Sequence, residues 1–174
     1  MSVTPQDLQE DSNFERLDQV GHKDMVPFVL QYYFDERTWL LGIHWMLTLG
    51  TAIAWLWIGI TQGTQISAWL AAALWAVLVF LLIVPVHEAL HGLGYYLLGA
   101  RDLRYSGSLR SLYVYVIAHD FVATAREVTW VALAPFFVIN SLLVVAAFLW
   151  PEQRLLWVGV LLLHLQGTAG DWQF

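Results

Sequence analysis

The sequence contains no cysteine, which excludes disulfide bonds and thiolate metal ligands. Charge is also scarce: Asp, Glu, Lys and Arg together make up 13% of the chain, against about 25% in soluble domains. No basic tract points to nucleic acid as a partner, and eight of the fourteen acidic residues fall within residues 1–36. The N-terminus also lacks the basic and then apolar order of a signal peptide.

Apolar residues are abundant instead, at 59% of the chain. Largely apolar runs over 39–60, 67–98, 128–150 and 155–169, in which Glu88 is the one charged residue, predict four spans, the last one shorter than the roughly 20 residues that usually cross a bilayer. Within residues 103–118, the stretch Tyr105-Ser106-Gly107-Ser108 is a turn signal, and the Tyr- and Val-rich segment 109–117 that follows it is typical of a strand. We therefore predict an all-α membrane protein with about four transmembrane helices and a small β-hairpin between the second and third spans.

The distribution of basic residues predicts the orientation. If the N-terminus is cytoplasmic, seven of the eight Lys and Arg residues lie on the cytoplasmic side and only Arg154 lies outside. We expect a multi-pass integral membrane protein with both termini cytoplasmic and the lipid bilayer as its surroundings. Residues 1–38 are interpreted as an acidic cytoplasmic tail with an interfacial helix near 26–34, and 39–174 as one membrane domain.

The pattern His87-Glu88-x-x-His91 lies at the end of the second predicted span. Two histidines four residues apart on one helix face can both ligate one Zn²⁺, and Glu88 is then a candidate general base for a metal-bound water. Each ionisable group inside a span costs roughly 2.5–3.5 kcal/mol on insertion scales. Three such groups without a structural use are improbable, so the pattern predicts a zinc site.

Helix rise suggests the third ligand. Counted from Arg154 at the outer face, Asp171 lies roughly 26 Å along the fourth span and His164 roughly 15 Å. Asp171 matches the depth of His87, whereas His164 lies about two turns too high unless the helix tilts or unwinds. We predict Asp171 as the third ligand, which leaves a fourth position open as in catalytic zinc sites. His164 remains a candidate for supporting the ligands, for contacting substrate or for replacing Asp171.

Other polar residues receive less specific interpretations. Asn140 in the third span is expected mainly to form an interhelical hydrogen bond, with a catalytic donor role as the alternative. His44 is expected to face the lipid headgroups rather than the site. His119 and Asp120 are expected to cap a helix after the hairpin, with lining the entrance to the site as the alternative, and Gly99 is expected to end the second predicted helix.

The stretch His87-Glu88-Ala89-Leu90-His91-Gly92-Leu93-Gly94, with Gly170-Asp171 in a later span, resembles the site-2 protease class of intramembrane zinc metallopeptidases. It is closer still to the prokaryotic membrane proteins grouped as putative zincin peptidases, over about 70 to 171. The resemblance includes the Pro-bearing span at Ala134-Pro135. It implies zinc-dependent cleavage of membrane-embedded or membrane-proximal peptide bonds in a prokaryotic cell membrane. His164 stands roughly where site-2 proteases carry an Asn, which implies a part in orienting substrate or stabilising the oxyanion.

A zinc metalloendopeptidase acting on a membrane protein or peptide is thus the leading functional hypothesis. The alternative is a non-catalytic zinc-binding membrane scaffold or regulator, which would need Glu88 to be dispensable. A transporter is disfavoured by the lack of internal repeats, and a di-iron oxidase would need more than the six histidines present. We also hypothesise that the hairpin around 103–118 offers a strand edge to an unwound substrate.

Overall fold

The computed structural model describes residues 5–10, 13, 39–108 and 113–173. A short helix, α1 (Pro5–Glu10), belongs to the predicted N-terminal tail. The predicted interfacial helix at 26–34 lies outside the described residues, as do four of the basic residues used for the orientation: Arg16, Lys23, Arg37 and Arg110. The orientation therefore stays a prediction.

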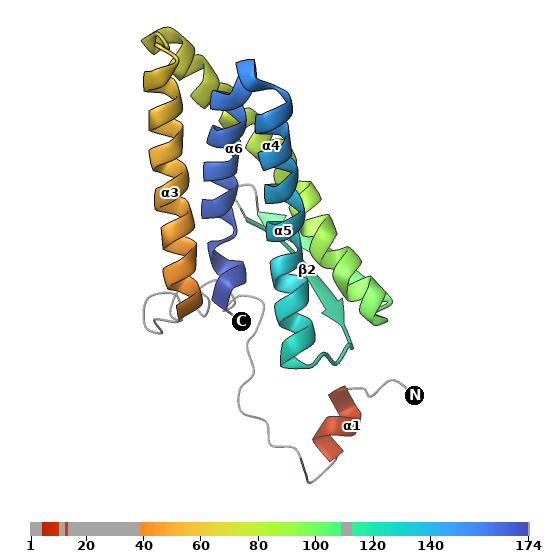
Figure 1. Ribbon diagram of the computed structural model, residues 1–174. Helices are drawn as coiled ribbons and strands as arrows, with labels where there is room; N and C mark the ends of the chain where they lie inside the picture. The colour runs from red at the N-terminus through yellow and green to blue at the C-terminus, as the bar shows by residue number, and fades with distance from the viewer. Residues whose placement is uncertain (1–4, 11–12, 14–38, 109–112, 174) are drawn as a thin grey trace.

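Four helices form a bundle: α3 (Trp39–Thr61), α4 (Ile66–Leu98), α5 (Ala125–Leu149) and α6 (Arg154–Gly167). Helix α6 contacts the other three, and α4 runs obliquely behind α5 and α6 (Figure 1). By length and composition, α3, α4 and α5 are each able to cross a membrane. Helix α6 has 14 residues, or about 21 Å of rise, and is shorter than a full span. The predicted fold class is confirmed.

Two short 3-10 segments flank α6. The first, η1 (Pro151–Gln153), forms the turn from α5, and the second, η2 (Ala169–Gln173), carries the chain onward from the end of α6. In the part of the chain that the structure describes, the turns between α3 and α4 and between α5 and α6 lie at one end of the bundle. The C-terminus lies at the other end (Figure 1).

Helix ends follow local chemistry. Gly99 ends α4 with a φ of 110°, a left-handed conformation that glycine adopts without strain, so the predicted stop is confirmed. Thr124 caps the start of α5: its hydroxyl accepts from the Glu127 N–H, while the Glu127 carboxylate accepts from the Thr124 N–H. The prediction that His119 and Asp120 cap this helix was wrong, because the helix starts several residues further on.

The hairpin is confirmed between α4 and α5, but residues 105–108, which were predicted to be its turn, belong to its first strand. Strand β1 (Asp102–Ser108) pairs antiparallel with β2 (Tyr113–His119), with Tyr105 opposite Val116. Strand β2 packs against α4. In β1, the exposed Arg104 side chain donates a hydrogen bond to the Asp102 carboxylate at 2.7 Å, which lowers the pKa of Asp102. An exposed ion pair of this kind adds little to the stability of the fold.

The core lies where α4, α5 and α6 meet. One buried cluster joins Ala76, Ile139, Leu143 and Val160, and a second joins Phe136, Leu165 and Trp172. Outward-facing positions carry large exposed apolar side chains, such as Leu82 and Phe148. An apolar surface of this extent suits lipid and not water, and the helices satisfy their backbone hydrogen bonds internally, as a bilayer requires.

Candidate metal centre

Helix α4 brings the two motif histidines to one point. His87 and His91 lie one turn apart on the same helix face, and their Nε2 atoms are 3.0 Å apart. Glu88 lies beside them: ligand atoms of all three residues fall within 4.8 Å of one another, a group able to hold a metal ion. The backbone of Val116 in β2 also lies close to the Glu88 carboxylate. The hairpin therefore lies against the motif helix at its acidic residue.

The end of the fourth helix adds a carboxylate to this cluster. Asp171 in η2 places Oδ2 3.3 Å from His87 Nε2 and Oδ1 3.5 Å from His91 Nε2. The segment is anchored by its neighbour Trp172, which is buried against Phe136 with ring centroids 4.7 Å apart. The change from the α-helix α6 to the 3-10 segment η2, together with the packing of Trp172, thus directs Asp171 toward the histidines of α4.

The Nδ1 atom of His91 faces a backbone acceptor. It lies 2.9 Å from the carbonyl oxygen of Val131 in α5. A carbonyl oxygen only accepts, so Nδ1 carries the hydrogen and Nε2 presents a lone pair. Pro135 explains why this carbonyl is available: it stands four residues later in the helix and has no N–H to donate to it.

His87 is oriented by side chains. Its Nδ1 lies 3.2 Å from Nε2 of His164, and Nδ1 of His164 lies 2.7 Å from Oδ1 of Asn140. The amide oxygen accepts, so His164 carries its hydrogen on Nδ1 and accepts at Nε2 from His87. Nε2 of His87 therefore also presents a lone pair toward His91 and Asp171.

A divalent metal fits this arrangement of donors. Two imidazole lone pairs and a carboxylate lie 3.0–3.5 Å apart with no hydrogen among them, and Asp171 Oδ2 is buried without a hydrogen-bond partner in the described structure. Such acceptors repel one another unless a cation lies among them. Ligand atoms at about 2.0–2.1 Å from a tetrahedral zinc are separated by about 3.3–3.4 Å. The nitrogen and oxygen donors are also those that zinc accepts in catalytic sites.

All six predicted site residues gather here, but two estimates of depth were wrong. His164 was placed about two turns away from His87 and instead contacts it. The estimate assumed parallel axes, whereas α4 crosses α6 obliquely (Figure 1). His44 does not face the headgroups: it is 0% exposed, with its ring 5.9 Å from that of Trp172. Distance along a helix does not indicate which neighbour covers a face.

Sequence reasoning missed the contributions of the backbone. The Val116 N–H and the Val131 carbonyl both contact motif residues, and neither depends on its own side chain. Only Pro135 gave a signal, because a proline inside a helix leaves the carbonyl four residues earlier without its donor.

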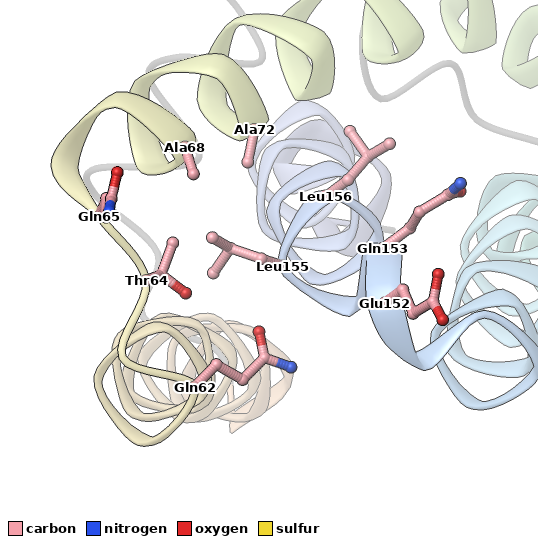
Figure 2. Close-up of a pocket in the computed structure, with 9 residues that line it drawn as sticks. All are labelled: Gln62, Thr64, Gln65, Ala68, Ala72, Glu152, Gln153, Leu155 and Leu156. Atoms are coloured by element: carbon pink, nitrogen blue, oxygen red, sulfur yellow. The ribbon is translucent and has the colours of Figure 1, made fainter.

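A cavity of about 460 Å³ lies away from this centre, at the turns that join α3 to α4 and α5 to α6 (Figure 2). Its lining includes the amide side chains of Gln62 and Gln65 at the turn from α3 to α4 and the leucines Leu155 and Leu156 of α6, as Figure 2 shows. None of the residues lining it belongs to the predicted site, so the candidate chemistry is not located in this cavity.

The fold and the side-chain cluster define a helical-bundle protein with a candidate centre for one metal ion, built from histidine and carboxylate. Residues 80–174 match the family model described as putative zincin peptidase, and the chain belongs to this family. No curated protein and no solved structure matches the chain. The family indicates a zinc metallopeptidase, and the group His87, Glu88 and His91 is compatible with it.

Proposed function

We propose that the protein is an intramembrane zinc metallopeptidase in which His87, His91 and Asp171 hold the metal and Glu88 is the general base. One observation carries the proposal: the Nε2 atoms of His87 and His91 and the carboxylate of Asp171 converge within 3.0–3.5 Å of one another, next to the carboxylate of Glu88. When bound, zinc would polarise a peptide carbonyl and lower the pKa of a water molecule.

Glu88 supplies the proton transfers. Its carboxylate takes a proton from the attacking water and later delivers it to the leaving amine. The backbone of Val116 lies close to this carboxylate, which places it between α4 and the hairpin. A purely structural metal site gains nothing from a glutamate beside its ligands, so this position favours hydrolysis over a scaffold or regulator.

The substrate is proposed to be a membrane-embedded or membrane-proximal peptide. Helices α3, α4 and α5 are each long and apolar enough to cross a bilayer. The site lies where α4 and α5, two of these helices, meet η2. Asp171 keeps 18% of its side chain exposed, which allows water to reach the cluster. An unwound substrate is proposed to pair with an edge of the hairpin, because β2 contacts α4 at Glu88. A photocrosslinker at Tyr115 is expected to capture a trapped substrate, and failure to capture it would exclude this docking mode.

Glu88→Gln tests the proposal. The full chain in proteoliposomes is expected to bind one zinc and cleave a transmembrane peptide, and the variant to keep zinc while losing cleavage by about 10²–10⁴-fold. Glu152→Gln is the matched control, since Glu152 lines the distant cavity. Undiminished cleavage by Glu88→Gln would exclude Glu88 as the base. Zinc binding by a wild-type chain that cleaves no membrane peptide would instead favour the scaffold or regulator.

A further inference from the structure

We propose that Asn140 and His164 are positioning residues that set which nitrogen of His87 is free for the metal. This inference rests on the proposed metal site. The hydrogen bonds run in one direction, from His87 Nδ1 to His164 Nε2 and from His164 Nδ1 to Asn140 Oδ1. In the contacts seen, neither residue touches the proposed metal-binding atoms, which are Nε2 of His87 and His91 and the carboxylate oxygens of Asp171. Both act through Nδ1 of His87, the ring nitrogen that faces away from the metal.

The two motif histidines differ in how their hydrogens are held. His91 faces the Val131 carbonyl, which can only accept, so its proton is held on Nδ1 whatever its surroundings. His87 faces another imidazole, which can either accept or donate. The state of His87 therefore depends on His164, and that of His164 depends on Asn140.

The amide of Asn140 sets the direction. With its oxygen toward His164, every ring in the series carries its hydrogen on Nδ1, and His87 Nε2 is bare. With the NH₂ group there instead, the series would reverse and place a hydrogen on His87 Nε2, which faces His91 and Asp171. That hydrogen would block one of the three proposed ligands.

Burial makes this control effective. His164 is 1% exposed, and Asn140 and His87 are each 8% exposed, so bulk water has little access to exchange partners with these groups. The three residues come from α6, α5 and α4, and the Asn140 NH₂ has no partner in the described structure. The bond to His164 is thus the one interaction seen here that orients the amide.

Zinc affinity of the full chain in detergent, measured by competition with a chelator, is the first test. Asn140→Leu and His164→Leu are expected to weaken zinc binding by about 10–100-fold, the usual cost of losing an outer partner of a ligating histidine. Asn140→Asp and His164→Gln, which keep an acceptor oxygen, are expected to stay within about threefold of wild type. Gln166→Leu, on the same helix, is the matched control, because Gln166 bonds only to Thr48 among the contacts seen.

Nitrogen NMR of ¹⁵N-histidine-labelled wild-type chain, without metal, is the second test and needs no variant to fold. His87, His91 and His164 are all expected to carry hydrogen on Nδ1. Hydrogen on Nε2 of His87 would overturn the inference, and so would wild-type affinity in both leucine variants. If the wild-type chain binds no zinc, the proposed function fails, while the NMR result still decides the direction of the hydrogen bonds.

Discussion

The Nδ1 atom of His91 lies 2.9 Å from the carbonyl oxygen of Val131, which Pro135 leaves without a helical donor. A proline in the third predicted span thereby exposes an acceptor to a histidine on the preceding helix. The contact holds the His91 hydrogen on Nδ1 and turns Nε2 toward His87 and Asp171.

Pro135→Ala tests this relationship. Alanine restores an N–H that competes with His91 for the Val131 carbonyl, so zinc affinity is expected to fall by up to about 10-fold. The measurement is chelator competition on the purified full chain. Pro151→Ala, in the turn before α6, is the control and is expected to bind zinc as wild type does. Unchanged affinity in Pro135→Ala would mean that the freed carbonyl has no bearing on metal binding.

Comparing Asp171→Ala with His164→Ala tests which of the two residues is the third metal ligand. Loss of a ligand is expected to weaken zinc binding by more than about 100-fold, whereas His164→Ala is expected to fall by about 10–100-fold as an outer partner. Metal content of the purified variants gives the readout. If Asp171→Ala kept full occupancy and His164→Ala lost it, His164 and not Asp171 would be the third ligand.

Removal of the metal is expected to lower stability as well as activity. A ligand that binds only the folded chain raises the free energy of unfolding by about 2.7 kcal/mol when its concentration is 100 times its Kd. Chelation of the full chain should therefore stop cleavage and lower Tm, and added Zn²⁺ should reverse both effects. A Tm that does not respond to chelation in a chain shown to contain zinc would contradict a metal that joins α4 to η2.

Gly92→Ala tests the contact between the motif helix and the hairpin. A Cβ at position 92 would collide with the hydroxyl end of the Tyr105 side chain. Tyr105 is 53% exposed, so its ring can turn away from α4, and we expect a cost of about 1 kcal/mol, with a lower Tm and slower cleavage.

Gly42→Ala is the control for this substitution, because a Cβ there meets nothing within 4 Å. Adding Tyr105→Ala to Gly92→Ala should remove the clash and restore much of the Tm. A double variant as unstable as Gly92→Ala alone would show that the cost arises elsewhere.

Much of the fold was predictable because its signals are local. Long, largely apolar runs predicted α3, α4 and α5 within a few residues of their observed ends, since a bilayer-length helix needs mainly continuous apolar side chains. The Tyr- and Val-rich segment predicted the second strand of the hairpin, but the turn predicted at 105–108 was wrong, because these residues pair within β1. The headgroup position of His44 was wrong because burial depends on the element that packs against it, here η2 with Trp172.

The sequence by itself determined the chemistry available: a histidine pair one turn apart with a glutamate between, in a chain without cysteine and surrounded by apolar residues. Only the tertiary structure decided how those groups are used. The crossing of α4 and α6 brings His164 to the Nδ1 atom of His87, and the turn into η2 brings Asp171 to its Nε2 atom. These relations join residues about eighty positions apart, and they depend on helix packing angles that no local pattern encodes.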